Sequence, residues 1–171
     1  MKYIYTTITF ALLAAATSAQ CEINVQIKGL RDTDLYLGYR FENKHYVADT
    51  ARVDSKGKAV FKNKTARHKG IYFVVLPNRQ SFDFLMTDNQ KFSIATDTAA
   101  LRSRTPSQPY IQFKNSPENT QFVEYQQFLE QQQLKAQRIL DEKKQNEQCG
   151  KDCIAKYDAM LDDVTFQLKS F

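Results

Sequence analysis

Hydrophobic and polar residues alternate along the first two thirds of the chain with the two-residue period of half-buried strands. The clearest case is Ile23, Val25 and Ile27, which are separated by polar residues. Alternation and β-forming residue types predict strands over residues 22–28, 35–41, 46–53, 59–61, 81–86, 91–96 and 110–114. A nearly continuous apolar run predicts one more strand over 70–76, central in its sheet and buried on both faces.

The period changes after Asn115, where the pattern becomes helical. Ser116 is suited to accept a backbone N–H bond as N-cap, Pro117 fits the first helical position, and Glu118 suits the positive end of the helix dipole. Apolar residues then recur at three- and four-residue steps and predict a helix from Pro117 to about residue 146: Phe122, Tyr125, Phe128, Leu129, Ala136, Ile139 and Leu140. A break at 148–151 and a second apolar stripe over 154–168 predict another helix, antiparallel to the first.

These elements predict an α+β fold. About eight short strands at hairpin spacing form an antiparallel β-sandwich or partly open barrel over residues 20–115, and a helical hairpin over 116–171 follows it. The composition, 42% apolar and 25% charged, is that of an ordinary globular chain with one core. A cluster of glutamines is interpreted as a polar helix face: Gln126, Gln127, Gln131, Gln132, Gln133 and Gln137.

Residues 1–19 read as a secretory signal peptide, because Lys2 precedes an apolar run over 8–16 and small residues end at Ala19. Cleavage there would leave Gln20 first and an exported, periplasmic or envelope-associated protein. A membrane anchor would need about 20 apolar residues, more than this run holds. Acylation of Cys21 is a further alternative, although Gln20 is large where lipoprotein processing favours a small residue.

The formal net charge is +5, and basic residues concentrate between residues 38 and 70. Because Lys56, Lys58, Lys62 and Lys64 alternate with other residues, this region is interpreted as a solvated strand face. An anionic envelope surface or an acidic partner is the alternative. Export argues against nucleic acid.

No motif for catalysis, cofactor binding or metal binding emerges. His45 and His68 lack metal-ligand spacing, and the chain contains no phosphate-binding loop, nucleophile elbow or zinc-protease motif. We therefore predict no catalytic, cofactor or metal residue, and no enzyme activity for this chain alone.

The one suggestive cluster is Cys149 and Cys153, four residues apart around Gly150. The simplest interpretation is a disulfide that closes the turn between the helices. Free thiols or a pairing with Cys21 are alternatives, and so is a redox-active pair, although thioredoxin-type motifs have two intervening residues rather than three.

Several strand, turn and cap segments carry a family resemblance: 27–30, 35–39, 49–57, 70–76 and 115–119. Over about residues 22–129 the chain resembles a domain of unknown function found in exported Gram-negative proteins. There it precedes a thioredoxin-like domain of the thiol-disulfide interchange or peroxiredoxin-like type. This chain has no Cys-x-x-Cys, so the resemblance implies either the N-terminal part of a longer protein or a stand-alone accessory domain.

Two functions follow as expectations. The first is a non-catalytic accessory module that positions or dimerises a thioredoxin-like oxidoreductase, fused or separate, with homodimerisation through the helices. The second is an envelope ligand-binding module with an aromatic cleft on the sheet, formed by Tyr36, Tyr39, Phe41, Tyr46, Phe82 and Phe84.

Overall fold

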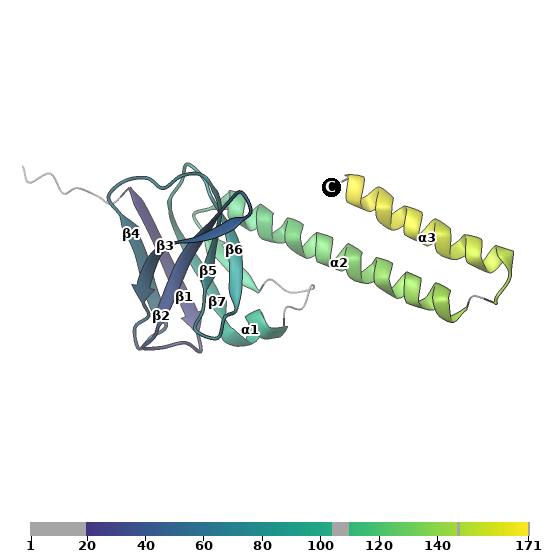
Figure 1. Cartoon of the computed structure of the whole chain (residues 1–171), viewed down its shortest axis with the longest axis horizontal. Helices are drawn as coiled ribbons and strands as arrows, with labels where there is room; N and C mark the ends of the chain where they lie inside the picture. Colours follow the sequence, from purple (N-terminus) through teal and green to yellow (C-terminus); the bar gives the residue numbers. More distant parts are fainter. Residues whose placement is uncertain (1–19, 104–109, 147, 171) are drawn as a thin grey trace, which may run out of the picture.

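The computed structural model describes residues 20–103, 110–146 and 148–170, so the expected signal peptide lies outside the described residues. Two four-stranded sheets face one another, and two long helices follow them (Figure 1). The first sheet has the order β4 (Lys58–Asn63), β1 (Cys21–Lys28), β7 (Lys91–Asp97) and β8 (Ile111–Lys114). The second has the order β3 (Lys44–Arg52), β2 (Asp34–Phe41), β5 (Gly70–Val75) and β6 (Ser81–Met86). The predicted α+β class, with eight strands and a C-terminal helical hairpin, is confirmed.

Strand pairing is antiparallel with one departure from the expectation. β1 and β7 run parallel, with Ile23 opposite Phe92 and Val25 opposite Ile94. After β6 the chain crosses from the second sheet to the first and enters β7 in the direction of β1. The first strand is therefore an inner strand, held by β4 on one side and β7 on the other.

The core lies between the two sheets. Alternate residues of each strand point inward, which is why the two-residue period identified them. The largest fully buried side chains come from both sheets: Phe61, Phe84, Phe92, Ile23, Ile27, Leu35, Leu37, Leu76, Met86 and Ile94. Phe84 and Phe92 meet edge to face across the core, with ring centroids 5.7 Å apart.

β5 is central in its sheet, as predicted, but the prediction that both its faces are buried is wrong. Tyr72 and Val74 face the core, whereas Phe73 and Val75 are half-buried and Ile71 is 39% exposed. The reason is that the helices project beyond the end of the sandwich rather than covering this outer face (Figure 1). Apolar composition does not reveal what covers a strand.

A short helix, α1 (Thr98–Ser103), follows β7 and was not predicted. The carboxylate of Asp97 accepts the backbone N–H of Ala100 at 2.5 Å and so caps its first turn. Leu101 anchors the helix in the core.

The hairpin consists of α2 (Pro117–Gln145) and α3 (Lys151–Ser170), which pack antiparallel as predicted (Figure 1). Among the described residues, the first turns of α2 contact the sandwich, through β6 and β8. Among residues 20–103, 110–146 and 148–170, no helix combines the length and the apolar character that a membrane span requires.

Candidate interaction surfaces

The hairpin is fastened to the sandwich by one buried amide. The Asn119 Oδ1 accepts the backbone N–H of Leu85 at 2.6 Å, and its Nδ2 donates to the Leu85 carbonyl at 2.8 Å. Leu85 lies on β6, the edge strand of the second sheet, so the amide occupies edge hydrogen bonds that a neighbouring strand would otherwise make. Asn119 is fully buried.

Ser116 occupies the predicted N-cap position, but its side chain makes no cap hydrogen bond. Its hydroxyl instead accepts a hydrogen bond from the Asn119 Nδ2 at 2.8 Å. Pro117 is at the start of the helix and Glu118 in its first turn, as predicted. The capping expectation was wrong in this detail because the amide three residues later competes for the same hydroxyl.

On the other side of α2 a shallow hollow separates the helix from β8, the edge strand of the first sheet. Its volume is about 310 Å³, and it is lined by Ile111, Phe113, Thr120, Val123, Glu124 and Gln127. Val123 is buried. The start of α2 therefore covers one side of the sandwich: it makes direct hydrogen bonds to β6 and leaves a hollow beside β8.

Few of the described side chains are buried between α2 and α3. Ile139 and Val164 are each 3% exposed, and Gln132 is buried with them. The Gln132 Oε1 has no hydrogen-bond partner, so the expected polar face does not extend to this glutamine. Two ion pairs connect the helices, Lys135 with Asp163 at 3.1 Å and Lys143 with Asp158.

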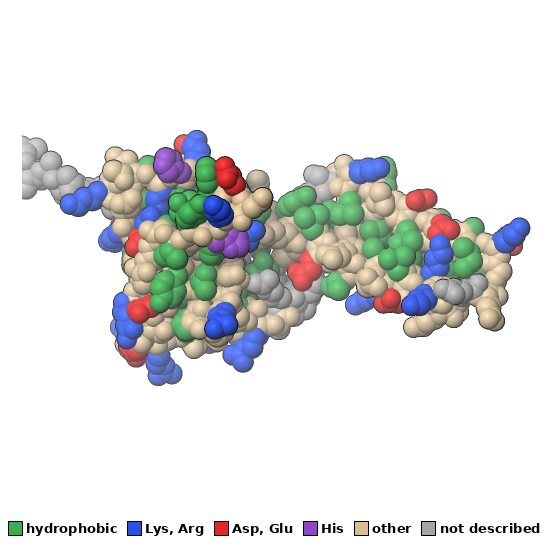
Figure 2. Space-filling model, in the orientation of Figure 1, with side chains coloured by type: hydrophobic (Ala, Val, Ile, Leu, Met, Phe, Trp, Pro, Cys, Tyr) green, Lys and Arg blue, Asp and Glu red, His purple; other side chains and the backbone are tan. Residues whose placement is uncertain are grey.

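Apolar side chains remain exposed along the hairpin (Figure 2). They come from both helices: Tyr125, Leu134, Leu140, Met160, Phe166 and Leu168. Phe166 is the most exposed of them, at 69%.

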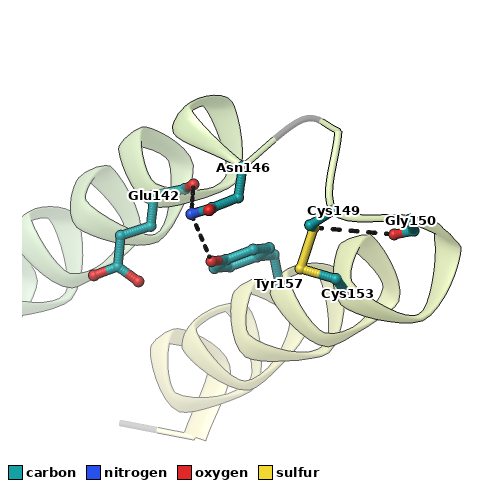
Figure 3. The surroundings of a disulfide bond; sticks show 6 residues. All are labelled: Glu142, Asn146, Cys149, Gly150, Cys153 and Tyr157. Carbon is teal, nitrogen blue, oxygen red and sulfur yellow. Dashed lines mark hydrogen bonds between the residues drawn. A yellow bond between two sulfur atoms is a disulfide. The ribbon is translucent and has the colours of Figure 1, made fainter.

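The structure joins Cys149 and Cys153 by a disulfide at the turn between the helices, with Cα atoms 5.7 Å apart (Figure 3). The neighbouring Asn146 donates its Nδ2 to the Glu142 carbonyl at 2.9 Å and to the Tyr157 hydroxyl at 3.2 Å. The disulfide therefore closes the first turn of α3 beside a hydrogen-bonded contact between the helices. This geometry agrees with the simplest interpretation of the two cysteines, a disulfide that closes the turn between the helices.

Cys21 is a free, fully buried cysteine at the start of β1. Burial raises the pKa of its thiol, and the nearby Arg67 guanidinium opposes that rise. Arg67 pairs with Asp49 at 2.5 Å, while Gln90 accepts the backbone N–H of Arg67 at 2.7 Å and donates to its carbonyl at 2.8 Å. Cys21 thus belongs to the packed end of the sandwich, and an acylated Cys21 would have to leave this position.

The six aromatic residues of the expected cleft do not face one space. Phe82 and Phe84 are buried in the core, whereas Tyr36 and Phe41 are exposed. Tyr39 and Tyr46 stack on one another with ring centroids 5.3 Å apart. The sheet divides this set, because neighbouring positions on a strand point to opposite faces.

His45 and His68 are both exposed, as expected, and the rings of His45 and Phe73 pack edge to face with centroids 5.3 Å apart. In the part of the chain that the structure describes, no group of three His, Cys, Asp or Glu residues could hold a metal ion. The basic region is largely exposed and several of its members have acidic partners: Arg40 with Asp83, Arg52 with Asp34, Lys62 with Glu22, and Lys69 with Asp88. Such exposed pairs stabilise a fold only weakly.

Comparison with protein families gives one match, to a family described as a domain of unknown function (DUF4369), over residues 21–122. No curated protein matches the chain. The matched segment contains all eight strands and ends within the first turns of α2, just after Asn119. The family match therefore ends within the turns of α2 that contact the sandwich.

Proposed function

The chain belongs to the DUF4369 family of domains of unknown function, and from this we propose that it is a non-catalytic exported accessory module. Its role is to position or dimerise a thioredoxin-like thiol-disulfide oxidoreductase, either fused to it or separate. The export part of the proposal comes from the signal-like composition of residues 1–19, and the choice of partner comes from the sequence resemblance.

The observation that carries an interaction role is the exposed apolar surface of the hairpin. A helix of an isolated globular protein buries its apolar stripe against the core. In the described part of the chain α2 contacts the sandwich through its first turns, and Leu134, Phe166 and Leu168 remain exposed. Surface of this kind is stabilised when a partner covers it.

The attachment of the hairpin supports a positioning role. A side chain that makes hydrogen bonds to both backbone groups of Leu85 restrains the helix in two directions, and Asn119 does this from the first turn of α2. The long helix then carries its far end about 40 Å from its start, at 1.5 Å per residue. A partner held on the hairpin would be held at a defined distance from the sandwich.

The test is site-specific photo-crosslinking in the native envelope. A photoreactive residue at Phe166 is expected to give a covalent adduct with a protein of thioredoxin-like fold, identified by mass spectrometry. The matched control carries the photoreactive residue at Lys58, which is exposed on β4, on the side of the sandwich away from the helices (Figure 1), and should not give this adduct. Equal yields of the adduct at both positions, or no such adduct at Phe166, would contradict the proposal.

Two further measurements test the remaining parts. N-terminal sequencing of the envelope-purified protein should begin at Gln20. The purified chain should not catalyse the reduction of a disulfide substrate. Catalysis that is lost on Cys149→Ser would show instead that the turn disulfide is redox-active.

A further inference from the structure

We propose that the outer face of the first sheet binds a short acidic glycan, that is, a sugar chain that bears carboxylate groups. The site is called the sheet trough here, and its side chains are those of Asn24, Gln26, Lys58, Val60, Ser93 and Ala95. They come from β1, β4 and β7 and surround a hollow of about 280 Å³. The inference goes beyond the proposed function, because the sheet trough lies on the sandwich and not on the hairpin.

The register of the sheet places these side chains on one surface. Alternate residues of β1, β4 and β7 point into the core, so the residues between them face outward. Two neighbouring cross-strand rows result: Val60, Asn24 and Ser93, then Lys58, Gln26 and Ala95. Neighbouring strands are about 4.8 Å apart, so each row spans about 10 Å. The rows together form one continuous patch.

The hollow exists because the middle of this face carries short side chains. Ser93 and Ala95 are outward positions of β7, which is an inner strand of its sheet. Strands favour β-branched and aromatic residues, and alanine is depleted in them. The longer side chains of Val60 and Lys58 border the hollow on the β4 side. A concave surface with apolar walls and a few polar groups is the usual form of a small-ligand site, and about 300 Å³ is the lower end of its size range.

The polar groups of the sheet trough are available to a ligand. The Asn24 amide and the Ser93 hydroxyl make no hydrogen bond with another described residue. The Gln26 Nε2 donates to the Lys56 carbonyl at 2.7 Å, which holds this amide in place. Amides and hydroxyls both donate and accept hydrogen bonds, as sugar hydroxyls do. The set therefore matches a hydroxyl-rich ligand better than a chain of phosphates, whose ionised oxygens only accept.

The outer face of the first sheet has more basic than acidic side chains. Its lysines are Lys28, Lys58, Lys62, Lys91 and Lys114. Its acidic residues are Glu22, which pairs with Lys62 at 3.5 Å, and Asp97, which lies opposite Lys28 on the neighbouring strand. Beside the face lie Lys56, Asp54 and Glu124. The surface therefore keeps an excess of positive charge, which attracts an anionic ligand.

Two of these lysines are placed to bind different carboxylates of one ligand. Lys58 borders the hollow on β4, and Lys114 lies opposite Ser93 on β8. Neither forms a salt bridge with another described residue, and a lysine ammonium forms strong charge-assisted hydrogen bonds with carboxylates. Three strand spacings separate β4 from β8, so the two backbone positions are about 15 Å apart. A chain of acidic sugars can span this distance, whereas a single small anion cannot.

The experiment is isothermal titration calorimetry of the disulfide-intact protein with a uronic-acid pentasaccharide at low salt. We expect a dissociation constant below about 1 mM. The double variant Lys58→Gln with Lys114→Gln should weaken binding about tenfold, because two charge-assisted contacts are lost. Ala95→Tyr should abolish binding, because the new ring fills the hollow while an outward tyrosine suits a strand.

Matched controls separate the sheet trough from the rest of the surface. Lys44→Gln with Lys156→Gln removes the same charge from exposed positions of β3 and α3, and Thr50→Tyr adds the same ring to an exposed position of β3. Both controls should bind as the unchanged protein does. If Ala95→Tyr loses the native circular dichroism, Asn24→Ala decides in its place and should weaken binding about threefold.

Each other outcome overturns a stated part of the proposal. Absence of heat with the pentasaccharide at millimolar concentration overturns the binding itself, and losses of equal size in the controls overturn its location. A neutral pentasaccharide that binds equally well overturns the role of the lysines. A glutamate peptide of the same charge, or inorganic phosphate, that binds equally well overturns the glycan as ligand.

Discussion

Replacing Asn119 tests whether one amide fastens the hairpin to the sandwich. In Asn119→Ala the Leu85 N–H and carbonyl both lose their partner, and so does the Ser116 hydroxyl. A net hydrogen bond contributes about 1 kcal/mol, and a buried group left without a partner costs about 1–3 kcal/mol. Since Leu85 is only half-buried and water can reach part of the edge, we expect the free energy of unfolding to fall by about 2–3 kcal/mol.

The assay is urea denaturation followed by far-ultraviolet circular dichroism, with the free energy extrapolated to water. Thr120→Ala is the control, because this neighbouring side chain is exposed and makes one long hydrogen bond to the Ser116 carbonyl at 3.3 Å. Its effect should stay within about 0.5 kcal/mol. If Asn119→Ala is as stable as this control, the amide does not hold the helix.

Asn119→Asp gives a second test with a defined pH dependence. The carboxylate can still accept the Leu85 N–H, but it cannot donate to the Leu85 carbonyl and instead repels it. Burial would raise the folded-state pKa of this carboxyl above its unfolded value of about 3.9. The penalty is therefore complete at neutral pH and decreases as the pH falls through the folded pKa. A variant whose stability relative to wild type does not improve between pH 7 and pH 4 would refute this explanation.

Three further predictions concern the sandwich. In Gly38→Ala the new Cβ would lie 2.3 Å from the Phe73 ring, so we expect the free energy of unfolding, measured by urea denaturation, to fall by about 1–3 kcal/mol. Adding Phe73→Leu should recover part of this loss, and an unchanged stability of Gly38→Ala would contradict the contact. The Asp54 carboxylate accepts the backbone N–H groups of Lys58 and Lys56 at 2.8 Å, and these hydrogen bonds lower its pKa. The carboxylate therefore stabilises the turn above pH ~3.9, and this stabilisation is lost as the pH falls through the lower pKa of the folded state. An NMR titration should find this pKa below its usual range, and a normal or raised value would refute the turn geometry. Cys21 is buried and burial raises the pKa of its thiol, so a thiol reagent should not react with the native unreduced protein. In urea the reagent should detect one thiol, and the detection of three would show that the turn disulfide is absent.

The strands and helices of this fold could be predicted because the spacing of apolar residues shows which side of each element faces the core. Ile23, Val25 and Ile27 alternate in the sequence and are buried together in the structure. The start of α2 at Pro117 followed from local backbone chemistry and was also predicted correctly. Both signals are contained within a few neighbouring residues.

Contacts between distant segments could not be predicted in the same way. The parallel pairing of β1 with β7 depends on where the chain returns after the five intervening strands, β2 to β6. The exposed face of β5 depends on the direction of the helices, and the amide contact joins Asn119 to Leu85, 34 residues earlier. Neither the pairing nor the contact is marked by a local pattern.

The attachment of α2 at its first turn makes the rest of the helix a spacer of adjustable length. Inserting seven residues after the docked turns would lengthen α2 by about 10 Å and rotate its far end by only about 20°, so the sandwich would be undisturbed. The family match ends at residue 122, within the docked turns. A longer or shorter α2 would therefore place its far end at a different distance from an unchanged sandwich.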